Sequence, residues 1–136
     1  MENVAIAEQL IAAINAEDID TMRKLYADDA KIWHDFDRKE QDPETNVQSL
    51  LVLRKAIPDV QWVTTRIEPL PNGFLLTYEL TMTFNKDTSG EKEMRIPACV
   101  IGTVDNERIV RLEEWVNSAP MMKYLTPEQL ATLAGQ

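Results

Sequence analysis

The stretch LYADDAKIWHDFD, residues 25–37, decides how the rest of the chain is interpreted. Its first half has the character of a helix end, and its second half alternates apolar and polar residues as a short strand does. It contains His34, the only histidine in the chain, with Asp35 and Asp37 close by. A helix that leads directly into a strand with a titratable side chain predicts a group that is aimed into a cavity.

Three helices are predicted around this stretch, because apolar residues recur there every three or four positions. The second is capped by Asp18 or Asp20 and ends near Asp29, and the third has Asp42 as its cap and Pro43 in its first turn. Between the stretch and the third helix, residues 38–42 are polar and predict a loop. The predicted helices cover residues 4–16, 18–29 and 43–57.

From residue 60 onward the apolar period changes to two, which predicts a series of strands. Turn residues such as Asn72-Gly73 and Ser89-Gly90 separate them. The predicted strands cover residues 60–67, 76–84, 93–104 and 108–117, and a short final helix covers about 126–134. Together these elements predict an α+β fold, in which a curved antiparallel sheet wraps around the N-terminal helices and leaves an apolar cavity between them.

The composition limits what the chain can bind. Its 136 residues contain no repeat and no linker, which predicts a single domain over residues 1–136. A formal charge of −9 would repel nucleic acid and anionic membrane surfaces. No run approaches the roughly 18 apolar residues of a membrane span, no signal-peptide pattern is present, and Cys99 alone forms no internal disulfide. These features predict a cytoplasmic protein.

Two segments, residues 18–30 and 108–115, carry a resemblance to the nuclear transport factor 2-like superfamily. The order of elements and the chain length are similar to its SnoaL-like and ketosteroid isomerase-like branches. The resemblance implies a cone-shaped domain with a small-molecule cavity, and a homodimer formed through the outer face of the sheet around Trp115. It does not specify the reaction, because this fold hosts isomerases, dehydratases, cyclases and non-catalytic binders.

The chain departs from the catalytic patterns of these relatives. The carboxylate base of the ketosteroid isomerases falls on His34, their second acid near Cys99, and their oxyanion-hole tyrosine near Leu10. The aspartate of the SnoaL-type cyclases falls near Val116 or Asn117. The isomerase mechanism is therefore not expected, and relatives that remove a proton with a histidine and a carboxylate are closer in residue type.

Three side chains are the candidate catalytic residues. His34 suits proton transfer in both directions near neutrality, because the unperturbed pKa of a histidine side chain is about 6.5. On the last strand Glu114 shares a face with Leu112 and Val116, so it would orient or charge-balance the imidazole. Tyr78 lies on an apolar strand face and would donate to a substrate oxygen. The alternatives are a structural histidine, a solvent-facing Glu114 and a core tyrosine bonded to the protein.

The remaining predicted site residues are ligand contacts, and two of them have competing interpretations. Cys99 also suits a small buried apolar filler, since no cation is near enough in sequence to activate it. Trp33 alternates with His34 and so points away from it if the strand is regular. The predicted ligand-binding set is Trp33, Leu80, Met82, Cys99, Leu112 and Val116.

No metal site or cofactor is predicted, because a single histidine beside Asp35 and Asp37 gives no ligand spacing and no glycine-rich phosphate loop is present. The leading hypothesis is a cofactor-independent isomerase, dehydratase or cyclase that acts on an apolar carbonyl compound. The alternatives are a non-catalytic ligand-binding module and a dimeric interaction module of the same fold.

Overall fold

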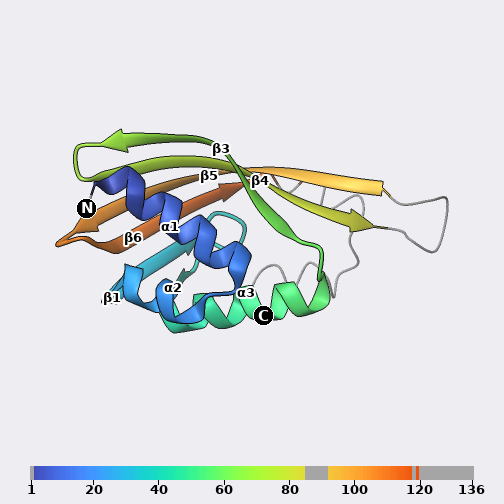
Figure 1. Ribbon diagram of the computed structural model, residues 1–136, viewed down its shortest axis with the longest axis horizontal. Coiled ribbons are helices and arrows are strands. Elements are labelled where there is room, and N and C mark those ends of the chain that lie inside the picture. The colour runs from blue at the N-terminus through green and yellow to red at the C-terminus, as the bar shows by residue number, and fades with distance from the viewer. Residues whose placement is uncertain (1, 85–91, 118, 120–136) are drawn as a thin grey trace.

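Three helices and a six-stranded sheet make up the part of the chain that the computed structural model describes, residues 2–84, 92–117 and 119 (Figure 1). The predicted hairpin loop at 85–91 and the predicted final helix at 126–134 lie outside these residues. The elements are, in order, α1 (Asn3–Ala16), α2 (Ile19–Leu25), β1 (Tyr26–His34), β2 (Glu40–Gln41), α3 (Pro43–Ala56), β3 (Gln61–Leu70), β4 (Gly73–Phe84), β5 (Lys92–Asp105) and β6 (Arg108–Val116).

Both predicted aspartate caps are present. Asp18 accepts a hydrogen bond from the backbone N–H of Thr21 at the start of α2, and Asp42 accepts one from Thr45 at the start of α3. Each bond satisfies an amide that has no partner inside its helix. Asp18 rather than Asp20 is therefore the cap of the second helix.

The second helix ends at Leu25, and the prediction that it continues to Asp29 is wrong. Tyr26 adopts an extended conformation and begins β1, which pairs along β6. Backbone pairing with a strand 80 residues further along outweighs the local helical spacing, and a single sequence window does not contain that information. The predicted loop at 38–42 also contains the two-residue strand β2, which pairs antiparallel with β1.

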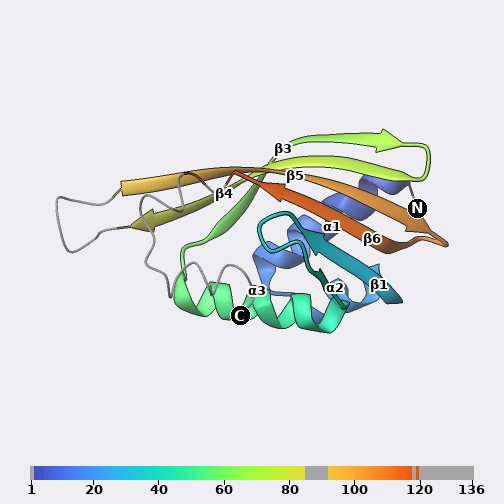
Figure 2. The same ribbon diagram turned by 180° about the vertical axis from the view of Figure 1, so that it is seen from behind.

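The strand order in the sheet is β2-β1-β6-β5-β4-β3. All neighbouring pairs are antiparallel except β1 and β6, which lie side by side and run in the same direction (Figure 2). The predicted α+β fold is confirmed, with this one parallel pair as an addition. The parallel pairing of β1 with β6 is possible because the connection between them passes through α3 and four other strands, which is long enough for a crossover.

The helices pack on one face of this sheet and enclose the core. α1 packs on β3 and β4, and α3 packs on β1. In both views α2 and α3 lie below the long strands β4 and β5 (Figures 1 and 2). The core includes side chains of α1, β1 and each of the four long strands, among them Ile6, Ile32, Trp62, Phe74, Ile96 and Ile109.

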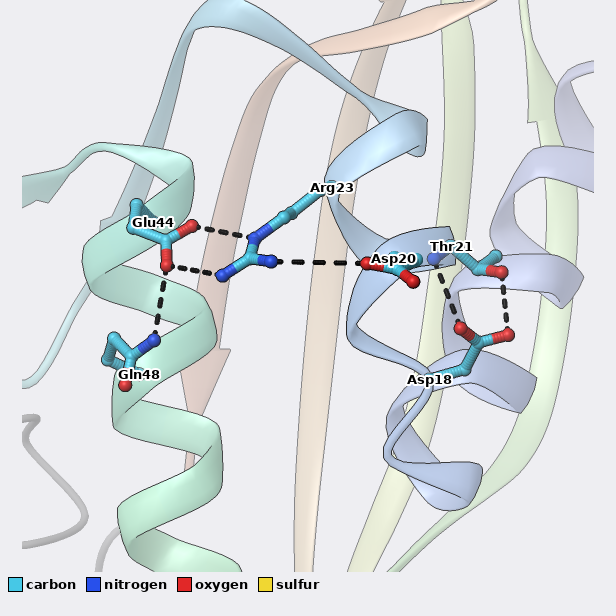
Figure 3. A network of polar contacts seen from close by, with 6 residues as sticks. All are labelled: Asp18, Asp20, Thr21, Arg23, Glu44 and Gln48. Carbon is cyan, nitrogen blue, oxygen red and sulfur yellow. Dashed lines mark hydrogen bonds and ion pairs between the residues drawn. The ribbon is translucent and has the colours of Figure 1, made fainter.

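A network of exposed polar contacts joins α2 to α3 (Figure 3). Arg23 donates two hydrogen bonds to Glu44, at 2.8 and 3.0 Å, and lies 4.0 Å from Asp20. Gln48 donates a further bond to Glu44 at 3.1 Å. These donors, with Arg23 first, lower the pKa of the Glu44 carboxyl to about 2. The network fixes how the two helices lie relative to each other below the sheet.

Candidate functional site

The register of β1 and β6 brings two predicted site residues together. His34 lies opposite Glu114 in this parallel pair, so both side chains leave the sheet on the same face. Asp35 extends the pairing, because its backbone N–H donates to the Glu114 carbonyl at 3.0 Å and its carboxylate accepts from the Val116 N–H at 3.1 Å. Asp35 therefore holds the strand ends that present His34 and Glu114.

The His34 imidazole faces the Glu114 carboxylate through one nitrogen. Nε2 lies 3.4 Å from Oε1 of Glu114, and the side chains are only 12% and 20% exposed. The other nitrogen, Nδ1, is buried and has no hydrogen-bond partner among the described residues. The ring also packs against Phe36, with ring centres 5.1 Å apart. A buried nitrogen without a partner costs stability, which makes it a candidate contact for a bound molecule.

Tyr78 is the third predicted residue in this group, but its hydroxyl is already engaged. It donates a hydrogen bond to Oε2 of Glu114. Burial raises the pKa of Tyr78 well above its usual value, and the negative charge of Glu114 adds to this effect, while the neighbouring indole of Trp62 acts in the opposite direction. Tyr78 is therefore a neutral donor that stabilises the carboxylate.

A second tyrosine, Tyr26, belongs to the same group and was missed by the sequence analysis. It is buried at the start of β1 and lines the same pocket as His34. Burial raises its pKa, and the charge of Glu114 raises it further. Alternation indicates Ala30, Ile32 and His34, but a register shift between Tyr26 and Lys31 separates Tyr26 from this pattern, and the predicted helix extended over that part of the chain.

These side chains open into a pocket of about 100 Å³ between the sheet and the helices. Glu114, Tyr78, Tyr26 and His34 form its polar wall on the sheet side. Further polar side chains reach it from β2 and α3, namely Gln41, Asn46 and Ser49. The rest of the lining is mostly apolar and includes Leu10, Ile14, Leu53, Leu76, Leu80, Ala98, Leu112 and Val116. A few polar groups in an apolar pocket are typical of a small-molecule site.

The predicted ligand contacts divide between the two faces of the sheet. Leu80, Leu112 and Val116 line the pocket, whereas Met82 is buried in the core beyond its lining. Trp33 and Cys99 do not line it. Trp33 packs edge-on against Trp115 on the outer face, with ring centres 5.5 Å apart, and Cys99 pairs with Trp115 across β5 and β6. Strand alternation places both on the opposite side from His34.

Trp62 is held at the pocket wall by two residues that the sequence analysis did not single out. The Asn15 side chain donates to the Trp62 carbonyl at 2.8 Å and accepts from its N–H at 2.9 Å. The Arg54 guanidinium lies 5.7 Å from the centre of the indole. The Asn15 contacts join residues 47 positions apart, so no local pattern indicates them. They fix the indole beside Tyr78.

In residues 2–84, 92–117 and 119, no group of three or more histidine, cysteine or acidic side chains is arranged to hold a metal ion. Within the same ranges, every helix is too short or too polar to cross a membrane.

Comparison with protein families gives one match. The SnoaL-like domain model matches residues 7–112, which include β1 and most of β6. A search of curated proteins found no significant match.

Solved structures of the same shape support this match. A candidate SnoaL-like polyketide cyclase from Jannaschia sp. CCS1 is similar with a TM-score of 0.76 and 14% identity, over 92% of each chain. IdmH, a candidate polyketide cyclase from Streptomyces antibioticus, gives 0.75 and 16% over 96% of this chain and 99% of its own. A cystatin-fold protein from Novosphingobium aromaticivorans gives 0.69 and 20%, over 84% and 97%. At these identities the likeness concerns the fold alone.

Proposed function

This chain belongs to the SnoaL-like domain family, and on that premise we propose that it is a cofactor-independent enzyme performing general acid–base chemistry on a small apolar carbonyl compound. One observation carries the proposal, namely the His34–Glu114 pair in a pocket with Nδ1 of His34 left without a partner. Leu80, Leu112 and Val116 supply apolar contacts to the substrate.

The proposed first step is proton removal from the carbon next to the carbonyl group. The proton passes to Nδ1 of His34. The C–H electron pair forms a new carbon–carbon double bond, and the π electron pair of the carbonyl group moves onto the oxygen. Return of the proton to a different carbon completes an isomerisation. Loss of a hydroxyl group as water completes a dehydration, and attack of the carbanion on a second carbonyl group closes a ring. All three outcomes share the first step.

Glu114 has two roles in this scheme. Its carboxylate accepts from Nε2–H of His34, so the neutral ring keeps Nδ1 as the acceptor. It also stabilises the imidazolium that forms when Nδ1 takes the proton. Tyr78 donates a hydrogen bond to the other carboxylate oxygen of Glu114, which gives this half-buried group a second polar partner. Tyr78 therefore acts through Glu114 in this proposal and not on the substrate oxygen.

The proposal is tested by proton exchange at carbon. Cyclohexanone in D₂O is expected to lose its α-proton NMR signals faster with the protein than in buffer alone. The difference between these two rates is expected to fall about 100-fold or more in His34→Gln. The folded state of the variant is checked by circular dichroism. Excess exchange that is unchanged in His34→Gln would contradict the role of His34.

The runner-up function is a non-catalytic small-ligand-binding module with the same pocket. Its support is the predominantly apolar lining, which binds a ligand without any chemistry. The same experiment separates the two, since a module of this kind binds the ketone and leaves its α-proton signals at the rate of buffer alone.

We also propose that the chain forms a homodimer through the outer face of its sheet. Trp115 is 38% exposed there and Val63 is 47% exposed, beside a shallow groove lined by Thr65, Thr77 and Cys99. Exposed aromatic and aliphatic side chains on one face are typical of an association surface. Trp115→Ala is expected to lower the mass measured by light scattering, and a monomeric wild type would contradict the proposal.

A further inference from the structure

We propose that Tyr26 binds the carbonyl oxygen of the substrate, and that the substrate part reaching it is acyclic or no larger than one six-membered ring. The inference rests on the proposed function, since it names the group that receives the negative charge developed in the first step. Tyr26 thus replaces Tyr78 as the expected hydrogen-bond donor to the carbonyl oxygen of the substrate.

The two buried tyrosines differ in whether the hydroxyl is free. Tyr78 donates its only hydroxyl hydrogen to Glu114. Tyr26 lines the same pocket, and no hydrogen bond joins its hydroxyl to another described residue. A hydroxyl that faces a pocket and does not already donate within the protein can donate to an acceptor on a ligand. Tyr26 is therefore the phenol available to a substrate oxygen.

Tyr26 is also suited to remain a donor while negative charge develops. Burial, and next the charge of Glu114, raises the pKa of Tyr26, so the phenol keeps its proton throughout the physiological range. An O–H group held in place in an apolar site stabilises a developing enolate oxygen more than it stabilises the ketone. His34 accepts the carbon-bound proton from the other end of β1, so the two roles belong to two separate side chains of the same wall.

The size of the pocket sets the class of substrate. A buried apolar cavity of about 150 Å³ holds one benzene molecule in another protein. The pocket here is about 100 Å³ and is bounded on the helix side by Leu10, Ile11 and Leu53. Fused ring systems are larger than one benzene ring and exceed this volume. The oxygen-bearing part of the substrate is therefore a short chain or a single ring.

The experiment uses 2-cyclohexen-1-one labelled with ¹³C at the carbonyl carbon. Bound to the wild type, its carbonyl signal is expected to move downfield, because the oxygen accepts a hydrogen bond. Tyr26→Phe is expected to return the signal toward the value of the bound ketone without that bond, and to weaken binding about five- to tenfold. Thr77→Val, which removes an outer-face hydroxyl bonded to Thr65 at 2.7 Å, serves as the matched control and keeps the downfield shift.

Replacing Tyr26 with 3-fluorotyrosine keeps the packing of the ring and covers the case in which Tyr26→Phe does not fold. Its more acidic hydroxyl is expected to move the carbonyl signal further downfield. A carbonyl signal that is the same in wild type, Tyr26→Phe and the fluorinated protein overturns the assignment. Binding of the two-ring ketone 2-tetralone as tight as that of 2-cyclohexen-1-one overturns the size limit.

The outcomes distinguish this inference from the proposed function. Exchange at carbon that depends on His34, together with a carbonyl signal insensitive to Tyr26, retains the function and rejects the inference. A Tyr26-dependent carbonyl shift without any exchange at carbon retains the oxygen site and rejects the chemistry.

Discussion

Glu113 and Glu114 are neighbours in β6, yet their surroundings differ because strand alternation sends them to opposite faces of the sheet. Glu113 is 35% exposed and lies 3.6 Å from the exposed guanidinium of Arg111. Glu114 faces an imidazole and a phenol inside an apolar pocket. Two adjacent glutamates therefore lie in different surroundings, Glu113 on an ordinary protein surface and Glu114 beside hydrogen-bond donors in a pocket.

The difference shows that the site depends on the inner face of β6 and on what packs over it. An exposed ion pair such as Arg111–Glu113 contributes little, because water and salt screen it. A half-buried carboxylate needs hydrogen-bonding partners in place of water, and for Glu114 these are Tyr78 and His34. The predictions that follow compare inner and outer positions directly.

The largest expected effect is on catalysis. Glu114→Gln is expected to lower α-proton exchange of cyclohexanone by about 100-fold or more, since the amide no longer stabilises the imidazolium. Glu113→Gln makes the same chemical change one residue away, on the outer face, and is expected to leave the rate unchanged. Equal rates for the two variants, measured by NMR in D₂O, would remove the distinction between the faces.

The next effect is on stability. Ile96 on the inner face of β5 is fully buried, and Ile96→Ala is expected to lower the free energy of unfolding by about 2–5 kcal/mol. Its neighbour Arg95 is exposed on the other face, beside Glu79 and Glu93. Arg95→Ala is expected to change the same quantity by less than about 0.5 kcal/mol. Urea denaturation of both variants measures the difference, and a similar loss in each would contradict the layered core.

An alkaline pH dependence is expected from the two tyrosines around Glu114. Burial raises the pKa of Tyr26 and Tyr78 above the ordinary value of 10.0. Above pH 10 the unfolded chain therefore loses these protons while the folded chain keeps them, and stability falls as the pH rises. The slope is expected to be about 1.4 kcal/mol per pH unit for each tyrosine.

Urea denaturation between pH 9 and pH 11 measures this slope. Tyr26→Phe removes one of the two groups, so it is expected to flatten the loss with pH even if it lowers stability at neutral pH. A slope that is the same in wild type and variant would mean that Tyr26 ionises as freely in the folded protein as in the unfolded chain.

The smallest effect concerns the exposed network between α2 and α3 shown in Figure 3. Arg23, as the main donor, lowers the pKa of Glu44 from 4.5 to about 2. The associated stability is present above pH 4.5 and is lost as the pH falls toward 2. Glu44→Gln is expected to reduce the acid-side loss slightly, and added salt is expected to do the same in the wild type. Thermal denaturation at pH 3 and pH 7 provides the check.

The sequence indicated the parts of the fold that depend on local patterns. The period of two in β4, the caps at Asp18 and Asp42, and the shared face of Leu112, Glu114 and Val116 all follow from spacing. The pairing of His34 with Glu114 also follows, once both are on inner faces of strands that meet. Such patterns are local because the period of a strand or helix fixes the face on which each nearby side chain lies.

The parts that the sequence did not indicate depend on contacts between distant segments. The start of β1 at Tyr26 is set by pairing with β6, and so Tyr26 was assigned to a helix. Asn15 and Arg54 hold Trp62 from two different helices. The outward position of Cys99 follows from a strand register that only the assembled sheet defines, whereas alternation with His34 already indicated that of Trp33.

The central claim is that Glu114 fixes the proton on Nε2 of His34 and leaves Nδ1 as the base. His34 is the only histidine, so its imidazole nitrogens are directly observable by ¹⁵N NMR without ambiguity. Near pH 8 the neutral ring is expected to be the Nε2–H tautomer in the wild type, and Glu114→Gln is expected to weaken that preference. A ring protonated on Nδ1 in the wild type would contradict the claim, because that nitrogen would then have no lone pair to accept a proton.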